Sequence, residues 1–245
     1  MSERSISLVL GAVSAVLIGI VLVLGLGVTG VDFVQGEAVR ILYIHPAVAW
    51  VAYMAFGITS VASIAWLRPK SRRLLWDQLA GSSAEIGVVF TFLALLTGSI
   101  WGRATWGVWW TWDARTTSTL LLLFLYIGVL ALRQVPQDRD ARARRSAVAA
   151  LLAFVNVPLV HFSVKWWRTL HQEASVIRVD RKLHGLQLTT LLIGVLAFTA
   201  LYFWLLIVRY RVARWEDSIS ESGLDDAIAS RRAEAARSSS VGALS

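Results

Sequence analysis

The sequence contains no cysteine, and this absence excludes disulfide bonds, thiolate metal sites and cysteine catalysis together. Charged residues are also scarce, at 16% of the chain, whereas hydrophobic residues make up 56%. That composition is too apolar for an ordinary soluble domain and indicates a membrane protein.

Several sequence motifs of catalysis are absent as well. The chain has no Gly-x-Ser-x-Gly or His-Glu-x-x-His pattern and no Walker-type glycine loop. These absences argue against a hydrolase and against nucleotide hydrolysis by the chain itself. Glu85 and Glu173 are the only acids near the apolar segments that are candidates for proton carriers, and we expect Glu85 to be solvated at the inner end of its helix.

What the sequence does have is a series of long runs without charge. Each run is about long enough to cross a hydrocarbon core of roughly 30 Å as a helix. Helices satisfy their own backbone hydrogen bonds in lipid, so the sequence predicts an all-α integral membrane protein with six transmembrane helices. The first run is longer than the apolar core of a signal peptide, and we expect it to be a retained helix. The charge-free runs are 5–31, 41–67, 86–102, 116–132, 146–164 and 183–208.

The distribution of lysine and arginine predicts the orientation. If the N-terminus is cytoplasmic, 16 of the 24 basic residues fall in inside segments. This two-to-one excess favours both termini inside, because cytoplasmic loops are enriched in Lys and Arg. The formal net charge of +8 is therefore a sign of topology rather than of a nucleic-acid partner. We expect residues 1–210 to form the membrane domain and residues 211–245 a cytoplasmic, mobile tail with a short helix near 222–237.

Local patterns predict further details of these helices. The third helix is expected over about 80–100, and Thr116, Thr117 or Ser118 is expected to cap the start of the fourth. Pro158 is expected to kink the fifth helix near its outer third.

Tryptophan gathers on the predicted outer face. The segment "WGVWWTWDARTT" (106–117) lies between two apolar runs, and seven of the twelve tryptophans lie in or near the two large outer segments. An aromatic belt is the simpler interpretation, but a belt would decorate both interfaces more evenly. If the loop is helical, Trp106, Trp109, Trp110 and Asp113 share one face, forming a flat aromatic shelf with a carboxylate at its edge. Such a shelf suits a large planar apolar ligand.

Histidines and arginines accompany this shelf. His45 starts the second helix, His171 lies in the second outer segment, His161 lies in the fifth helix and His184 starts the sixth. A single histidine at a helix end is usually a polar interface residue, but two on different segments of one face suit the axial ligation of haem iron. Arg40 and Arg115 match the carboxylates of haem propionates, although Arg115 is equally explained as a surface partner of Asp113.

Three motifs resemble a known family. "WGRATWGVWWTWDARTTS" resembles the WWD signature of the haem-handling membrane proteins of cytochrome c maturation. "LYIHPA" and "VNVPLVHFSVKWWRTLHQ" resemble the flanking signatures of the CcmC type. The resemblance covers the chain from about Arg40 to His171. It implies a protein of the bacterial inner membrane that holds haem b at the outer face. It also implies delivery of that haem to a CcmE-type chaperone, alongside a CcmD-type small membrane protein and CcmA- and CcmB-type ABC transporter subunits.

The resemblance also implies roles for individual residues. His45 and His171 match the axial ligands of the haem iron, and Arg40 and Arg115 match positions important for haem or for the chaperone. His161 matches a family position as a supporting residue, whereas His184 has no counterpart. Thr116 departs from the leucine that often follows Asp-Ala-Arg in the signature. The haem platform matches Trp101, Trp106, Trp109, Trp110, Trp112 and Asp113.

Three functions compete at this point. The first is a haem-binding and haem-delivery protein without turnover of its own. The second is the haem lyase or synthetase branch (CcsA or CcmF types), whose chains carry a WWD loop, further helices and a second pair of histidines within the membrane. In this chain His161 is the only plausible intramembrane histidine. The third is a transporter subunit in which the tryptophan face only docks partners.

Overall fold

The computed structural model describes residues 3–33, 35–135, 138–171 and 185–242, with the backbone alone for 224–229 and 233–242. Over these residues the chain is helical and forms no strand. The elements are α1 (Glu3–Val23), η1 (Leu24–Val28), η2 (Glu37–Tyr43), α2 (His45–Leu67), η3 (Pro69–Ser71), α3 (Leu74–Trp106), α4 (Ala114–Gln134), α5 (Arg139–Phe154), α6 (Asn156–Trp166) and α7 (Gly185–Gly242).

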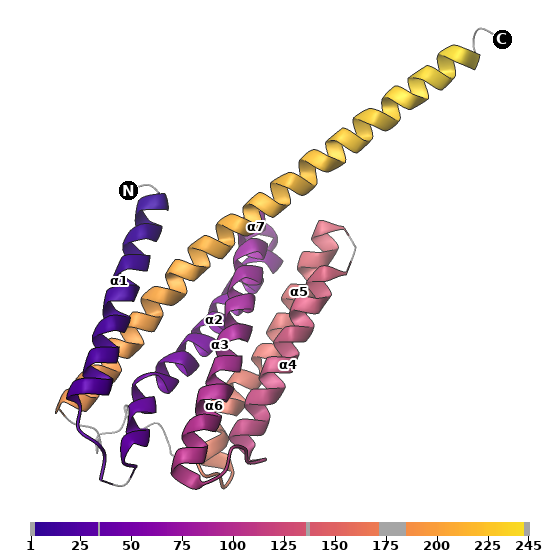
Figure 1. The fold of residues 1–245 in the computed structure, drawn as a ribbon. Helices are drawn as coiled ribbons and strands as arrows, with labels where there is room; N and C mark the ends of the chain where they lie inside the picture. The colour runs from indigo at the N-terminus through magenta and orange to yellow at the C-terminus, as the bar shows by residue number, and fades with distance from the viewer. Residues whose placement is uncertain (1–2, 34, 136–137, 172–184, 243–245) are drawn as a thin grey trace.

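Six segments of the described chain are long and apolar enough to cross a membrane, which confirms the predicted fold. The fifth of them combines α5 and α6. Figure 1 shows these segments as a bundle in which α1 lies against α7 and in which α4, α5 and α6 form the opposite side. The start of α1 and the end of α7 point toward the same end of the bundle.

The centre of the bundle is the packed pair α2 and α3. Phe56 of α2 is fully buried and stacks on Tyr126 of α4, with ring centroids 3.7 Å apart. Gly87 of α3 permits this arrangement, because a Cβ atom built there would clash with Cε1 of Phe56. On the other side of the pair, Tyr202 of α7 is buried and its hydroxyl lies 2.7 Å from Oγ of Ser83. The three contacts fix how α2, α3, α4 and α7 approach one another.

The third helix is longer than the sequence indicated. It begins at Leu74 and continues to Trp106, so Trp101 and Trp106 are helical residues rather than loop residues. It ends because Gly107 takes a left-handed conformation with φ of 78°, which side chains with a Cβ atom disfavour. The segment 107–113 is irregular, so the expected helical face of Trp106, Trp109, Trp110 and Asp113 is wrong.

Other boundaries also differ from expectation. The side chain of Asp113 caps α4, instead of Thr116, Thr117 or Ser118, because the helix already begins at Ala114. The break predicted near Pro158 is confirmed at Val155, between α5 and α6.

The last helix and Glu85 differ as well. Helix α7 continues without interruption through the segment where we expected a separate short helix near 222–237. Glu85 is half-exposed, but it lies 11 residues inside α3 rather than at the helix end where we expected it, and its carboxylate pairs with Arg209 of α7.

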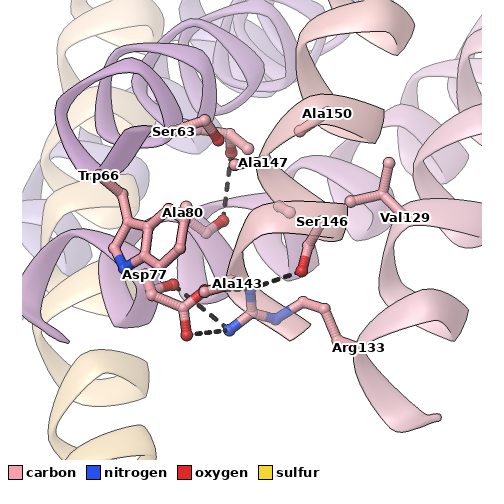
Figure 2. A pocket seen from close by; sticks show the side chains of 13 residues that line it. Ser63, Trp66, Asp77, Ala80, Val129, Arg133, Ala143, Ser146, Ala147 and Ala150 are labelled. Carbon is pink, nitrogen blue, oxygen red and sulfur yellow. Dashed lines mark hydrogen bonds and ion pairs between the residues drawn. The ribbon is translucent and has the colours of Figure 1, made fainter. Parts of the chain in front are cut away.

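An ion-pair network closes the end of the bundle opposite Trp106. Asp77 of α3 is buried, and its Oδ1 lies 2.7 Å from Nη1 of Arg133, which is near the end of α4 (Figure 2). Nη2 of Arg142 in α5 lies 3.2 Å from Oδ2 of the same carboxylate. Arg142 and Arg139 also reach Asp217 of α7, at 3.8 Å. A cavity of only about 10 Å³ lies on the α4 and α5 side of Asp77, and a larger hollow of about 270 Å³, lined by Trp66, Arg72 and Arg139 among others, lies on its other side.

Candidate functional site

The residues singled out by the sequence gather at the end of the bundle where α3 ends. His45 is the first residue of α2, Trp101 and Trp106 lie in the last turns of α3, and Asp113 immediately precedes α4. His171 follows α6 by a few residues. The antiparallel path of the helices brings these five positions to one end, as the predicted topology required.

Asp113 joins the tryptophan loop to the segment of His171. Its Oδ1 accepts hydrogen bonds from the backbone N–H of Thr116 at 2.9 Å and from the hydroxyl of Thr116 at 2.7 Å. Its Oδ2 accepts from the hydroxyl of Thr169 and lies 2.9 Å from Nδ1 of His171. One carboxylate therefore caps α4 and also orients the imidazole of a residue that is 58 positions away.

The charges of this pair follow from its surroundings. Burial alone would raise the pKa of the Asp113 carboxyl, but hydrogen bonds from Thr169, Thr116 and His171 outweigh it and lower this pKa to about 2. Burial lowers the pKa of His171 below its usual 6.5, although the Asp113 carboxylate opposes the shift. At neutral pH the pair is a carboxylate and a neutral imidazole. Because the carboxylate only accepts, Nδ1 of His171 carries the proton and Nε2 keeps its lone pair.

His45 lies against α3. Its Nδ1 is 2.9 Å from Oγ1 of Thr97, and its ring meets the edge of Trp101 with centroids 5.6 Å apart. The ring of Trp106, five positions further along α3, meets the ring of His171 at 4.9 Å. His45 and His171 are close enough to interact electrostatically. The end of α3 therefore contacts both imidazoles.

The tryptophans of the loop form an exposed aromatic surface beside these histidines. Trp109 is 60% exposed and Trp112 is 76% exposed. Trp110 is less exposed and meets the edge of Trp112, with centroids 5.4 Å apart. At the end of α6, Trp166 and Trp167 are also more than half exposed. Because apolar surface of this kind is costly to leave wet, this end of the protein is suited to a large apolar ligand or partner.

Two buried donors at this end have no acceptor among the described residues. They are Nε1 of Trp110 and Nε of Arg115. Arg115 uses another nitrogen, Nη2, to donate to the backbone carbonyl of His161 at 3.2 Å, and its charge acts on both His45 and His171. The expected alternative, an Asp113–Arg115 pair, does not form in the described part of the chain. Arg115 is thus a cation near both histidines, and its Nε has no acceptor among the described residues.

Arg40 is occupied differently from the expectation that it pairs with a ligand carboxylate. Its Nη1 donates to the carbonyl oxygens of Gly25 at 2.7 Å and Leu26 at 2.6 Å, and its Nε pairs with Glu37. The carbonyls at the end of η1 lack helical partners, so Arg40 satisfies them and fastens η2 to the first membrane segment.

The imidazole of His161 makes its ring contacts away from the other two described histidines. His161 is exposed on α6, where it meets the ring edges of Tyr53 and Phe162 and lends its backbone carbonyl to Arg115. His184 and Glu173 lie outside the described residues.

Three contributors escaped the sequence interpretation: Thr97, Thr169 and Gln35. Gln35 accepts a hydrogen bond from Nε1 of Trp101 at 3.0 Å. Thr97 precedes Trp101 by one helical turn, and that spacing was a usable signal for a shared face. Gln35 and Thr169 reach the site through chain folds that their neighbours in sequence do not indicate.

The described residues contain no group of three or more His, Asp or Glu side chains able to hold a bare metal ion. The donor set at this end consists of two imidazoles. It fits an ion that brings its own equatorial ligands, as the iron of haem does.

Comparisons with known proteins agree with one family. The family model described as heme exporter protein C matches residues 1–223. Heme exporter protein C of Bradyrhizobium diazoefficiens is 44% identical over 184 residues, which are 74% of this chain and 68% of that protein. The protein of the same name from Haemophilus influenzae is 40% identical over 201 residues, or 80% of each chain. The one from Escherichia coli K12 is 36% identical over 205 residues, or 82% of this chain and 81% of that protein. A match over nearly the whole chain, together with six membrane-spanning helices, shows that the protein belongs to the heme exporter protein C (CcmC) family.

Proposed function

We propose that this protein binds haem b at the outer face of the bacterial inner membrane and delivers it to a CcmE-type chaperone for the maturation of c-type cytochromes. Haem is its cargo, and the chain performs no turnover of its own. Relatives named heme exporter protein C and the membrane-spanning helices support a role in haem handling at a membrane.

The observation that carries this proposal is the state of the two imidazoles. Nδ1 of His45 and Nδ1 of His171 each face an acceptor, Thr97 and Asp113 respectively. In both rings Nε2 therefore keeps the lone pair that can bind iron, and metal-binding histidines are normally oriented in this way. When bound, haem iron supplies the acceptor for these two lone pairs.

The surrounding residues suit the rest of a haem molecule. Exposed rings of Trp109 and Trp112 offer apolar area for the porphyrin. Nε1 of Trp110 and Nε of Arg115, for which the described part of the chain offers no acceptor, match acceptor groups such as propionates. Arg40 contributes through the fold, because it holds the segment before His45 to the first membrane helix.

The remaining assignments follow from topology and from the family. We assign residues 1–210 to the haem-handling membrane domain and residues 211–245 to a cytoplasmic tail, with both termini inside. CcmD-, CcmA- and CcmB-type partners would supply the other parts of the complex, including nucleotide hydrolysis, since this chain has no Walker-type loop.

The test is the optical spectrum of purified protein, with and without added haem. We expect a bis-imidazole spectrum, and we expect His45→Ala and His171→Ala each to lower the haem content. His161→Ala is the matched control, because the His161 ring lies on α6 against the ring edges of Tyr53 and Phe162, and its backbone carbonyl, which accepts from Arg115, is kept in the variant. Full occupancy and an unchanged spectrum in both ligand variants would contradict the proposal.

The lyase or synthetase branch is the second candidate, and it makes a different prediction for His161. A second haem signal that disappears in His161→Ala would favour that branch. Haem-free protein from haem-replete membranes would instead favour a subunit whose tryptophan face only docks partners.

A further inference from the structure

The imidazole of His45 packs against three residues of α3. Thr97 provides Oγ1 at 2.9 Å from Nδ1, Gly98 lies beneath the ring, and Trp101 meets the ring edge at a centroid distance of 5.6 Å. A Cβ atom added at Gly98 would lie 3.0 Å from Cε1 of His45, which is closer than side chains normally pack. The missing side chain at Gly98 therefore lets the ring rest against the helix.

The hydroxyl of Thr97 determines which nitrogen of His45 carries the proton. A threonine hydroxyl has one proton to donate. Oγ1 of Thr97 lies 2.7 Å from the carbonyl oxygen of Leu93, one turn back in α3, and donates its proton there. Toward His45 the hydroxyl can then only accept, so Nδ1 is the protonated nitrogen and Nε2 carries the lone pair. The backbone carbonyl of Ala94 lies 3.4 Å from the Thr97 hydroxyl. The same carbonyl is a second acceptor for the His45 imidazole.

The two histidines thus have the same tautomer but different acceptors. His45 donates to a neutral hydroxyl and faces a neutral carbonyl, whereas His171 donates to the Asp113 carboxylate. Hydrogen bonds to an ionised acceptor are roughly twice as strong as neutral ones. A carboxylate behind an imidazole also raises its basicity as a ligand.

From this difference we propose that Thr97 is a positioning residue for His45, and that its neutral hydroxyl makes His45 the weaker imidazole donor of the pair. In haem-loaded protein, His45 would then be the ligand that an incoming molecule displaces, and His171 would stay bound to the iron. This inference rests on the proposed haem ligation, and it adds to it an order of release.

The first experiment compares the two ligands one at a time. In ferrous, haem-loaded full-length protein, His45→Ala leaves His171 as the protein ligand and His171→Ala leaves His45. Resonance Raman spectroscopy reads the iron–imidazole stretching frequency of each. We expect a higher frequency when His171 remains, because its acceptor is charged. Equal frequencies, or the reverse order, would overturn the inference.

The second experiment changes the α3 residues that pack against His45 and keeps both histidines. Carbon monoxide is titrated into the ferrous, haem-loaded protein. The optical spectrum gives the carbon monoxide concentration at which half of the protein has lost an imidazole ligand. Thr97→Val removes the acceptor hydroxyl at nearly constant volume. We expect the carbon monoxide concentration at half-displacement to fall about five-fold, because one ordinary hydrogen bond is lost. Thr97→Ser keeps the hydroxyl and should behave like the parent. Gly98→Ala should also ease displacement, since its Cβ pushes the ring.

The outcomes separate this inference from the proposed function. If the parent protein binds no haem, the proposed function fails and this inference fails with it. If haem binds with two imidazoles but Thr97→Val matches the parent, only the role of Thr97 is refuted. The Raman comparison uses variants in which Thr97 is intact. It therefore still tests the order of ligand strength if Thr97→Val fails to fold.

Discussion

Asp113 has two roles in this protein that a single substitution can separate. It caps α4 through Oδ1 and orients His171 through Oδ2. Asparagine is also a good N-cap, so Asp113→Asn preserves the cap, removes the charge and replaces Oδ2 with an amide NH2 that cannot accept from Nδ1 of His171. Alanine removes both and should cost a further 0.5–2 kcal/mol, roughly, in stability.

The charge of Asp113 is measurable through the protonation of His171. The pKa of His171 is already below 6.5 because of burial, and the carboxylate raises it. In Asp113→Asn we therefore expect this pKa to fall further. An NMR titration of the ligand-free protein measures it, with His171→Ala identifying the signal. A pKa that rises or stays constant in Asp113→Asn would contradict the assignment of the pair.

The same shift determines how stability depends on pH. Folded His171 binds a proton less readily than unfolded His171, so its contribution to stability is complete above pH 6.5 and is lost as the pH falls below it. Asp113 has a lowered pKa, and its contribution is lost only as the pH falls from about 3.8 toward 2. The loss of stability caused by His171 therefore begins at a higher pH than the loss caused by Asp113.

Thr116 shows how a departure from the family signature is accommodated. Where the signature often has leucine, this chain has a hydroxyl that donates to Asp113 at 2.7 Å. We expect Thr116→Leu to raise the pKa of Asp113 toward its usual value, since one of the bonds that lower it is lost, while the backbone N–H of residue 116 still caps. Carboxyl titration by infrared spectroscopy measures this, and an unchanged Asp113 pKa would contradict it.

At the scale of the helices, hydropathy predicted the six spans, but it did not predict where α3 ends. Helix α3 continues past its charge-free run (86–102) to Trp106, and Gly107 ends it. Periodicity alone extended a helical face through Trp109 to Asp113, because a pattern of spacings contains no information about the left-handed turn at Gly107. The candidate site was predicted at the level of its conspicuous residues, His45, Trp101, Asp113 and His171 among them. Thr97, Thr169 and Gln35 depend on tertiary contacts and were not.

The crossing of α2 and α3 depends on the missing side chain of Gly87. Gly87→Ala places a Cβ atom against the buried ring of Phe56, and overpacking of this kind costs about 1–3 kcal/mol. Gly57→Ala is the matched control, because nothing lies within 4 Å of a Cβ atom there. Thermal unfolding followed by circular dichroism should show a lower Tm for Gly87→Ala alone. Equal Tm values would show that the crossing can relax without cost.

The junction of α3, α4 and α5 depends on Asp77. Its carboxylate is buried between Arg133 and Arg142, so Asp77→Ala removes the carboxylate partner of Arg133 and leaves Arg142 with only its longer contact to Asp217. Breaking a buried pair in this way costs about 3–5 kcal/mol. Glu221→Gln is the control, because Glu221 is 59% exposed and its pair with Arg139 is worth about 1 kcal/mol or less. If both variants lose the same stability, the Asp77 network does not hold the junction.

At the scale of the whole molecule, the two ends of the bundle differ in chemistry. The end near Trp106 has exposed aromatic rings and uncharged imidazoles, whereas the opposite end has the network around Asp77. An even number of spans places both termini on one side, with the Asp77 end. The proposed delivery of haem to an external chaperone requires that side to be cytoplasmic.

The orientation can be tested directly, because the chain has no cysteine and is its own labelling background. Val31 is 57% exposed between η1 and η2, Lys70 is exposed in η3, and Ser222 is exposed on α7. In intact spheroplasts, a membrane-impermeant maleimide should label Val31→Cys and spare Lys70→Cys and Ser222→Cys. All three should react after permeabilisation, which controls for accessibility. The inverse pattern would place His45 and His171 at the cytoplasmic face, where haem held between them has no route to a chaperone outside.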